Sequence, residues 1–116
     1  MAMLMRFPGG SSNEVSIRSC EGIMTLLTQA VQDAGFQFFD WNVDSDDAGQ
    51  AYRKKTVLAN VKQGVADAGI GLVLQHDIHS YSVDAVEEII LWGLENGYDF
   101  LPLTENSPGF HHPLNN

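Results

Sequence analysis

The stretch Gly71-Leu72-Val73-Leu74-Gln75-His76-Asp77 decides the fold class, because an unbroken apolar run ends in a histidine and an aspartate. Short apolar runs are typical of parallel strands that are buried on both faces. In α/β folds the functional side chains follow the carboxyl ends of such strands. His76 therefore lies where a side chain that titrates near neutral pH can act on a substrate, although such a histidine can equally be a hydrogen-bonded structural residue.

Helices, glycines and strands alternate around this stretch. Apolar residues at helical spacing predict helices over residues 21–34, 57–68 and 82–96. Ser19 and Ser82 are expected to cap the first and third helices. Each helix is followed by a glycine that can end it in the left-handed conformation. The apolar residues expected to face the core are Ile23, Leu26, Leu27, Ala30, Val31 and Ala34 in the first helix, Val57, Leu58, Val61, Val65 and Ala68 in the second, and Val83, Val86, Ile90 and Leu94 in the third.

Four strands are predicted, over residues 4–6, 36–43, 70–75 and 98–103. Strands that alternate with helices of this length favour right-handed crossovers and a parallel sheet. About four parallel strands with three helices make an α/β fold of roughly half the size of a closed (β/α) barrel. The sequence is consistent with a small open domain or with a partial barrel that another segment completes, and either one leaves strand edges to be covered.

Composition limits the function. The chain has 116 residues, which predicts one domain over residues 1–105 followed by a surface tail over 106–116. A net charge of −9 argues against nucleic acid and anionic membrane surfaces as partners. The single Cys20 excludes an internal disulfide, no apolar stretch is long enough to cross a bilayer, and the first residues lack the basic region of a secretory signal.

Polar residues follow three successive strands. Arg6 and the loop Pro8–Gly10 follow the first, the acidic loop Asp44–Asp47 follows the second, and His76 follows the third. Taken alone, each of these features has a structural explanation. Arg6 can form a salt bridge, Pro8–Gly10 can be a plain turn, and Asp44–Asp47 can cap the next helix. Because the carboxyl ends of parallel strands share one side of a sheet, their coincidence predicts a functional site.

Three ordered motifs resemble those of a known family. Arg6-Phe7-Pro8-Gly9-Gly10-Ser11, Asp40-Trp41-Asn42-Val43-Asp44-Ser45-Asp46-Asp47 and Leu72–Asp77 closely resemble motifs of the polysaccharide deacetylases of carbohydrate esterase family four, and the resemblance extends to Leu103. It implies a distorted (β/α)7-type barrel, of which this chain would be the C-terminal half. It also implies removal of N-acetyl, or sometimes O-acetyl, groups from chitin- or peptidoglycan-type sugars by a divalent metal of the zinc or cobalt type and a water nucleophile.

The same resemblance implies roles for individual residues. His76 is similar to the general acid that protonates the leaving amine, and Asp47 to the carboxylate that holds this histidine and favours its charged form. Arg6 resembles the arginine that orients the catalytic base. Substrate-binding positions are implied for Gly9, whose amide would stabilise the oxyanion, for Leu74 beside the acetate methyl, and for Trp41.

The sequence departs from the family pattern at two positions. Gly9 stands where an aromatic residue commonly follows the proline, and Ala48 stands where a tryptophan commonly follows the aspartate assigned to Asp47. The register of the acidic loop is therefore open. Asp44 is the alternative partner of His76.

The family's catalytic-base and metal-binding motifs lie upstream of the arginine motif. Neighbouring residues at a strand end point in opposite directions, so His76, Asp77 and His79 are not expected to form a metal site, and the tail pair His111-His112 is expected to be solvated. We therefore expect this chain to bind no metal and to be inactive alone. It would bind acetylated polysaccharide and pair with an N-terminal half or a second copy. The family that the sequence resembles usually acts outside the cell or at its wall. The alternatives are a non-catalytic sugar-binding or assembly module, and a small open α/β domain that pairs through its sheet edges.

Overall fold

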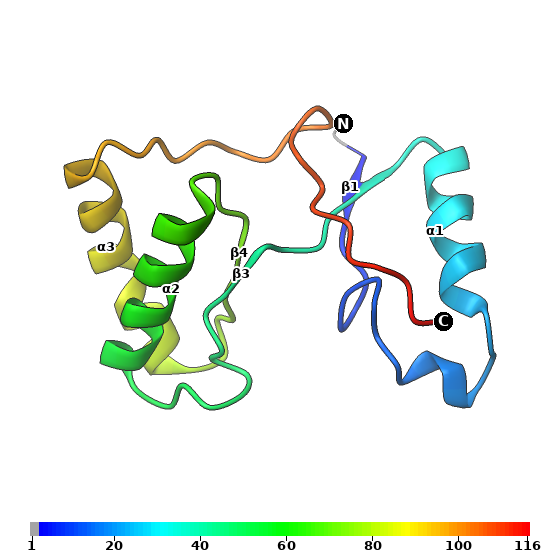
Figure 1. Cartoon of the computed structure of the whole chain (residues 1–116), viewed down its shortest axis with the longest axis horizontal. Coiled ribbons are helices and arrows are strands. Elements are labelled where there is room, and N and C mark those ends of the chain that lie inside the picture. The colour runs from blue at the N-terminus through cyan, green and yellow to red at the C-terminus, as the bar shows by residue number, and fades with distance from the viewer. Residues whose placement is uncertain (1–2) are drawn as a thin grey trace. The chain divides into compact units, whose positions relative to one another are not determined.

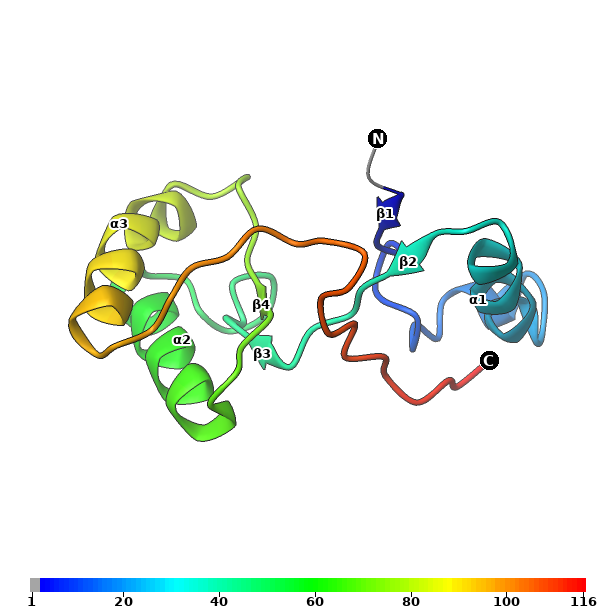
Figure 2. The same cartoon turned by 90° about the horizontal axis from the view of Figure 1, so that it is seen from above.

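The computed structural model describes residues 3–116, and these form two compact units. The first contains the chain up to Trp41 together with Leu103–Asn116, and the second is Asn42–Pro102. Figure 1 and Figure 2 show the elements of each unit from two directions. None of the helices within residues 3–116 has both the length and the apolar character needed to cross a membrane.

The first unit contains two short parallel strands and a helix. Strands β1 (Leu4–Met5) and β2 (Gln37–Phe38) pair with Leu4 opposite Gln37. A 3₁₀ turn, η1 (Ser16–Arg18), leads into helix α1 (Ile23–Asp33). The buried centre of this unit consists of Phe7, Met24 and Phe38.

The second unit contains the other pair of parallel strands and two helices. Strands β3 (Val43–Asp44) and β4 (Val73–Leu74) pair with Val43 opposite Val73. Helices α2 (Lys54–Ala68) and α3 (Ser80–Glu95) pack side by side, as Figures 1 and 2 both show. The buried core between them consists of Ala51, Val57, Val61, Ala85 and Ile89.

The α/β class and the parallel strand pairing are confirmed, and so are the glycines that end the helices. Gly35, Gly69 and Gly97 follow α1, α2 and α3 with φ of 89°, 77° and 81°. The two predicted serine caps are wrong. Gly22 and His79 occupy the N-cap positions of α1 and α3. The partial (β/α) barrel remains a prediction.

Two strand predictions need correction. The run 36–43 does not form one strand, because at Asp40 the backbone N–H donates to the carbonyl of Gly109 (3.0 Å), so the run divides into β2 and β3. Residues 98–103 form no strand within the described part of the chain. Tyr98 instead stacks on Trp92 of α3, with ring centroids 5.5 Å apart.

The buried face of α3 differs from the predicted one. The residues that face the core are Ser82, Ala85, Ile89 and Gly93, whereas the predicted residues Val83, Val86, Ile90 and Leu94 are exposed. Small side chains let this helix lie close to its neighbours; a Cβ on Gly93 would stand 2.5 Å from the Phe100 ring. The prediction was wrong because helical spacing alone cannot distinguish two adjacent stripes, and the more apolar stripe was chosen.

In α1 the predicted face is only partly correct. Leu26 and Leu27 are exposed, and Met24 and Thr28 are the buried residues. The face predicted for α2 is confirmed at Val57 and Val61, which are fully buried.

Candidate functional site

The second unit brings His76 and Asp47 into direct contact. His76 follows β4, and Asp47 belongs to the loop between β3 and α2. The ring Nδ1 of His76 lies 2.7 Å from Oδ1 of Asp47, and the backbone N–H of His76 donates to Oδ2, also at 2.7 Å. The aspartate side chain is fully buried, whereas the imidazole is 30% exposed. The pair therefore presents a histidine to solvent on a buried carboxylate.

Hydrogen bonds keep the buried carboxylate ionised. Burial by itself would raise the pKa of Asp47, because it disfavours the charged form. The ring and backbone N–H of His76 and the hydroxyls of Ser82 and Ser45 outweigh burial and lower this pKa to about 2. An ionised carboxylate only accepts hydrogen bonds, so Nδ1 of His76 carries the proton in this contact. The nitrogen left for a substrate is Nε2.

The structure distinguishes the two candidate partners of His76. Asp44 is exposed, and its Oδ1 accepts a hydrogen bond from the backbone N–H of Asp46 (2.8 Å). Asp47 is the residue that bonds the histidine. Leu74 is half-buried in β4, opposite Asp44 and two residues before His76.

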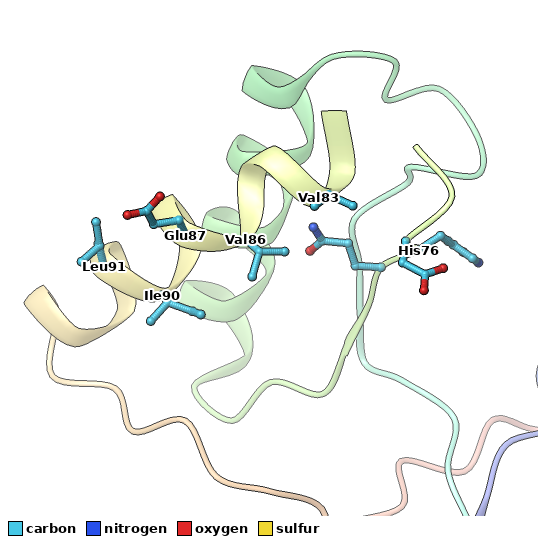
Figure 3. Close-up of a pocket in the computed structure, with 8 residues that line it drawn as sticks. His76, Val83, Val86, Glu87, Ile90 and Leu91 are labelled. Carbon is cyan, nitrogen blue, oxygen red and sulfur yellow. The ribbon is translucent and has the colours of Figure 1, made fainter. Parts of the chain in front are cut away.

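An open groove of about 660 Å³ begins beside this pair. Figure 3 shows His76 at one end of it and Leu91 towards the other. The walls are formed by Gln75, His76 and Asp77 after β4 and by Val83, Val86, Glu87, Ile90 and Leu91 of α3. The side chains that were expected in the core therefore form an apolar surface next to the histidine.

The first unit contains the other three predicted site residues. Arg6 and Gly9 are exposed, and Trp41 is half-buried. Residues 7–10 form a tight turn, closed by the N–H of Gly10 donating to the carbonyl of Phe7 (2.8 Å), with Gly9 at φ 73°. Proline followed by glycine at the two corners is the order that a type II turn prefers. A cleft shared by Arg6, Asp47 and His76 remains a prediction.

A second buried carboxylate, Asp40, organises this turn. Its side chain accepts hydrogen bonds from the backbone N–H of Ser11 (2.8 Å), the hydroxyl of Ser11 and the backbone N–H of His112 (2.8 Å). Burial would raise the pKa of Asp40, but the Ser11 hydroxyl, the Ser11 N–H and the His112 N–H lower it below its usual value. Asp40 thus connects the arginine-motif loop to the C-terminal segment.

His111 and His112 were expected to be solvated, but both make specific contacts. His112 donates from Nε2 to the carbonyl of Trp41 (2.7 Å), and its Nδ1 lies 3.0 Å from the hydroxyl of Ser12. The ring of His111 stacks on Phe38 with centroids 3.7 Å apart. Both rings therefore pack on the unit that contains Arg6.

Replacing Gly10 by alanine is expected to destabilise the first unit. At φ 82°, a Cβ on this residue would stand 2.8 Å from Cη2 of Trp41. Gly22 is a matched control, because it has φ 80° and a Cβ added there would meet nothing within 4 Å. Both substitutions incur left-handed strain, but Gly10→Ala should cost about 1–3 kcal/mol more because it also displaces the indole.

This difference is measurable by urea unfolding of the two variants in a Trp92→Phe background, where Trp41 is the remaining indole. Equal losses of stability in Gly10→Ala and Gly22→Ala would show that the Trp41 ring does not restrict the side chain at position 10.

The known proteins that are similar to this chain are deacetylases. Over 97% of its length the chain resembles the catalytic domain of peptidoglycan N-acetylglucosamine deacetylase from Eubacterium rectale, with 52% identity, a TM-score of 0.94 and 52% of that chain covered. The chain is related to the polysaccharide deacetylases of carbohydrate esterase family four. No family model matches it.

Two further polysaccharide deacetylases from Bacillus cereus resemble the chain. A peptidoglycan-N-acetylglucosamine deacetylase is 36% identical over 103 residues, which are 84% of this chain and 36% of that protein. The crystal structure of a polysaccharide deacetylase is 33% identical, with a TM-score of 0.57, over 84% of this chain and 48% of that one. The chain thus spans about half of the solved deacetylase chains and about a third of the curated relative.

The residues described here do not form a metal site by themselves. Within residues 3–116, no three His, Cys, Asp or Glu side chains are grouped so that they could hold a metal ion. His76 is bonded through Nδ1 to Asp47.

Sequence reasoning missed Asp40, Ser11 and Ser82 as parts of buried polar networks. The signal for Asp40 was a carboxylate directly after Phe38 and Phe39, since a buried charge requires several hydrogen-bond donors. Ser82 was interpreted as a helix cap. Its hydroxyl in fact donates to Oδ2 of Asp47 at 2.7 Å.

Proposed function

We propose that this chain supplies the proton-donating part of a polysaccharide deacetylase. The substrates would be N-acetyl, or O-acetyl, groups on peptidoglycan- or chitin-type sugars. The observation that carries the proposal is the contact between the half-buried His76 and the buried, ionised Asp47. It occurs in a chain that is 52% identical to the catalytic domain of a peptidoglycan N-acetylglucosamine deacetylase.

His76 acts as the general acid in this proposal. Hydrolysis of an acetamide leaves an amine, which departs only when its nitrogen has received a proton. Asp47 accepts from Nδ1 of His76, so the proton that is given to the amine comes from Nε2. The carboxylate holds the ring through Nδ1 and fixes the tautomer that remains after the transfer.

The remaining predicted residues receive supporting roles. Arg6 would orient the catalytic base, and the amide of Gly9 would donate to the oxyanion that forms during attack on the acetyl carbonyl. Leu74 and Trp41 would contact the sugar or its acetyl group. These roles rest on the positions of the residues in the family motifs.

A catalytic base and a divalent metal, of the zinc or cobalt type, would come from another polypeptide segment. The motifs that resemble the family here are those of the arginine, the acidic loop and the histidine. We therefore propose that this chain alone does not hydrolyse acetylated sugars.

Association with a complementary segment is part of the proposal, and self-association is its alternative. Val83, Val86, Ile90 and Leu91 present an exposed apolar surface on α3. Two-stranded sheets also leave backbone groups at their outer edges that another strand can pair. Apolar surface and free strand edges both favour a partner.

The proposal is tested by adding a segment that carries the catalytic base and the metal site. The chain is mixed with the separately produced N-terminal part of the Eubacterium rectale catalytic domain, and acetate release from N-acetylglucosamine oligomers is measured with zinc or cobalt. We expect a one-to-one complex by light scattering and metal-dependent release by the mixture, and neither component alone should release acetate.

Two results would contradict the proposal. Turnover by the 116-residue chain alone would refute the division of the machinery. A complex that forms and binds the oligomers but releases no acetate would refute the enzymatic role and support a non-catalytic sugar-binding module.

A further inference from the structure

Ser82 lies at the point where the first turn of α3 meets the His76–Asp47 pair. The residue is fully buried. Its hydroxyl donates to Oδ2 of Asp47 at 2.7 Å, because the ionised carboxylate can only accept. Oδ2 also accepts the backbone N–H of His76, while Oδ1 accepts the imidazole. Each carboxylate oxygen is thus directed by its own donors.

The first turn of α3 also contacts the backbone of Asp47 and the residue before His76. The carbonyl of Ser82 accepts a hydrogen bond from Nε2 of Gln75 (2.6 Å), the residue directly before His76. The hydroxyl of Tyr81 donates to the backbone carbonyl of Asp47 (3.3 Å). The start of α3 therefore contacts both the acidic loop and the end of β4.

We infer that Ser82 is a positioning residue for the general acid, because it fixes the rotation of the Asp47 carboxylate and thereby the orientation of the His76 ring. A carboxylate with one oxygen held by Ser82 keeps the other oxygen facing Nδ1. Without the hydroxyl, the backbone N–H of His76 is the remaining donor to Oδ2. The carboxylate then has one donor fewer to fix its rotation, and the orientation of the ring is held less tightly. This role rests on the proposed function.

The direct test measures the Asp47 carboxyl in the intact 116-residue chain by a pH titration of its ¹³Cγ resonance. Ser82→Ala removes a hydrogen bond that favours the ionised form, so the acid dissociation constant of Asp47 should fall about tenfold. The Hδ1 proton of His76 should exchange with water faster. Ser80→Ala is the matched control, because Ser80 lies exposed in the same helical turn and should leave both signals unchanged.

A second variant covers the case in which Ser82→Ala does not fold. Ser82→Cys keeps a side chain of similar size with a weaker donor, and it should shift the Asp47 titration in the same direction by less. An Asp47 titration unchanged in every folded Ser82 variant would overturn the inference and leave Ser82 a packing residue.

The consequence for turnover is separable from this measurement. In the complemented assay, Ser82→Ala should lower kcat about tenfold with KM unchanged, because the acid is misoriented while sugar contacts remain. A shifted Asp47 titration with an inactive wild-type mixture would count against the deacetylase proposal alone. An unshifted titration with an active mixture would count against Ser82 alone.

Discussion

Replacing His76 by alanine is expected to lower kcat of the complemented enzyme by at least about 100-fold, the size of effect typical of a lost general acid. The change removes the nitrogen proposed to protonate the leaving amine, whereas the α3 wall of the groove and the proposed sugar-binding positions are unchanged. KM should therefore change little. The measurement is acetate release by the mixture as a function of oligomer concentration.

His79→Ala is the matched control for this substitution. His79 lies three residues away, and its ring stacks on Tyr81 with centroids 4.8 Å apart. It should retain most of the wild-type kcat. Activity of His76→Ala close to that of His79→Ala would remove the proton-donor role from the pair.

The second large effect is the loss of stability of residues 42–102 in acid. The pKa of Asp47 is about 2 in the folded chain against an ordinary value of 3.8. A pKa that is depressed by folding contributes stability above the unfolded value, and this stability disappears as the pH falls through the folded value. Asp47 should therefore contribute about 2 kcal/mol at neutral pH, lost progressively between about pH 5 and pH 2.

Urea unfolding from pH 7 down to pH 2 measures this contribution. In a Trp41→Phe background, Trp92 is the remaining indole and reports the second unit. Asp47→Asn should remove most of the pH dependence in this range, since the amide does not titrate. Asp44→Asn, a change at an exposed carboxylate three residues away, should leave the dependence as in the parent. Equal slopes for the parent and Asp47→Asn would show that another group dominates acid unfolding.

The sequence was sufficient to predict that the strands are parallel, but not where each strand begins and ends. Apolar runs and the glycines after helices indicated parallel α/β structure, because both signals are local. The break at Asp40 depends on Gly109, 69 residues further along the chain, so no local pattern reveals it. For the same reason residues 98–103 looked like a strand, although their aromatic side chains pack on α3 instead.

The candidate site shows the same limit. The position of His76 after a buried run was sufficient to select it, but the choice between Asp44 and Asp47 depended on three-dimensional contact. The buried face of α3 was predicted wrongly because Ser82, Ala85 and Gly93 are small, so the face that they share is the less apolar one. Close helix packing favoured the small residues, and hydropathy alone favours the large ones.

The His76–Asp47 contact joins residues only 29 positions apart, and Ser82 lies 35 positions from the same carboxylate. All three belong to the stretch Asn42–Pro102. One contiguous stretch of the chain therefore supplies the histidine, the carboxylate and the hydroxyl. Recombination that exchanged the flanking segments would therefore leave these three residues together.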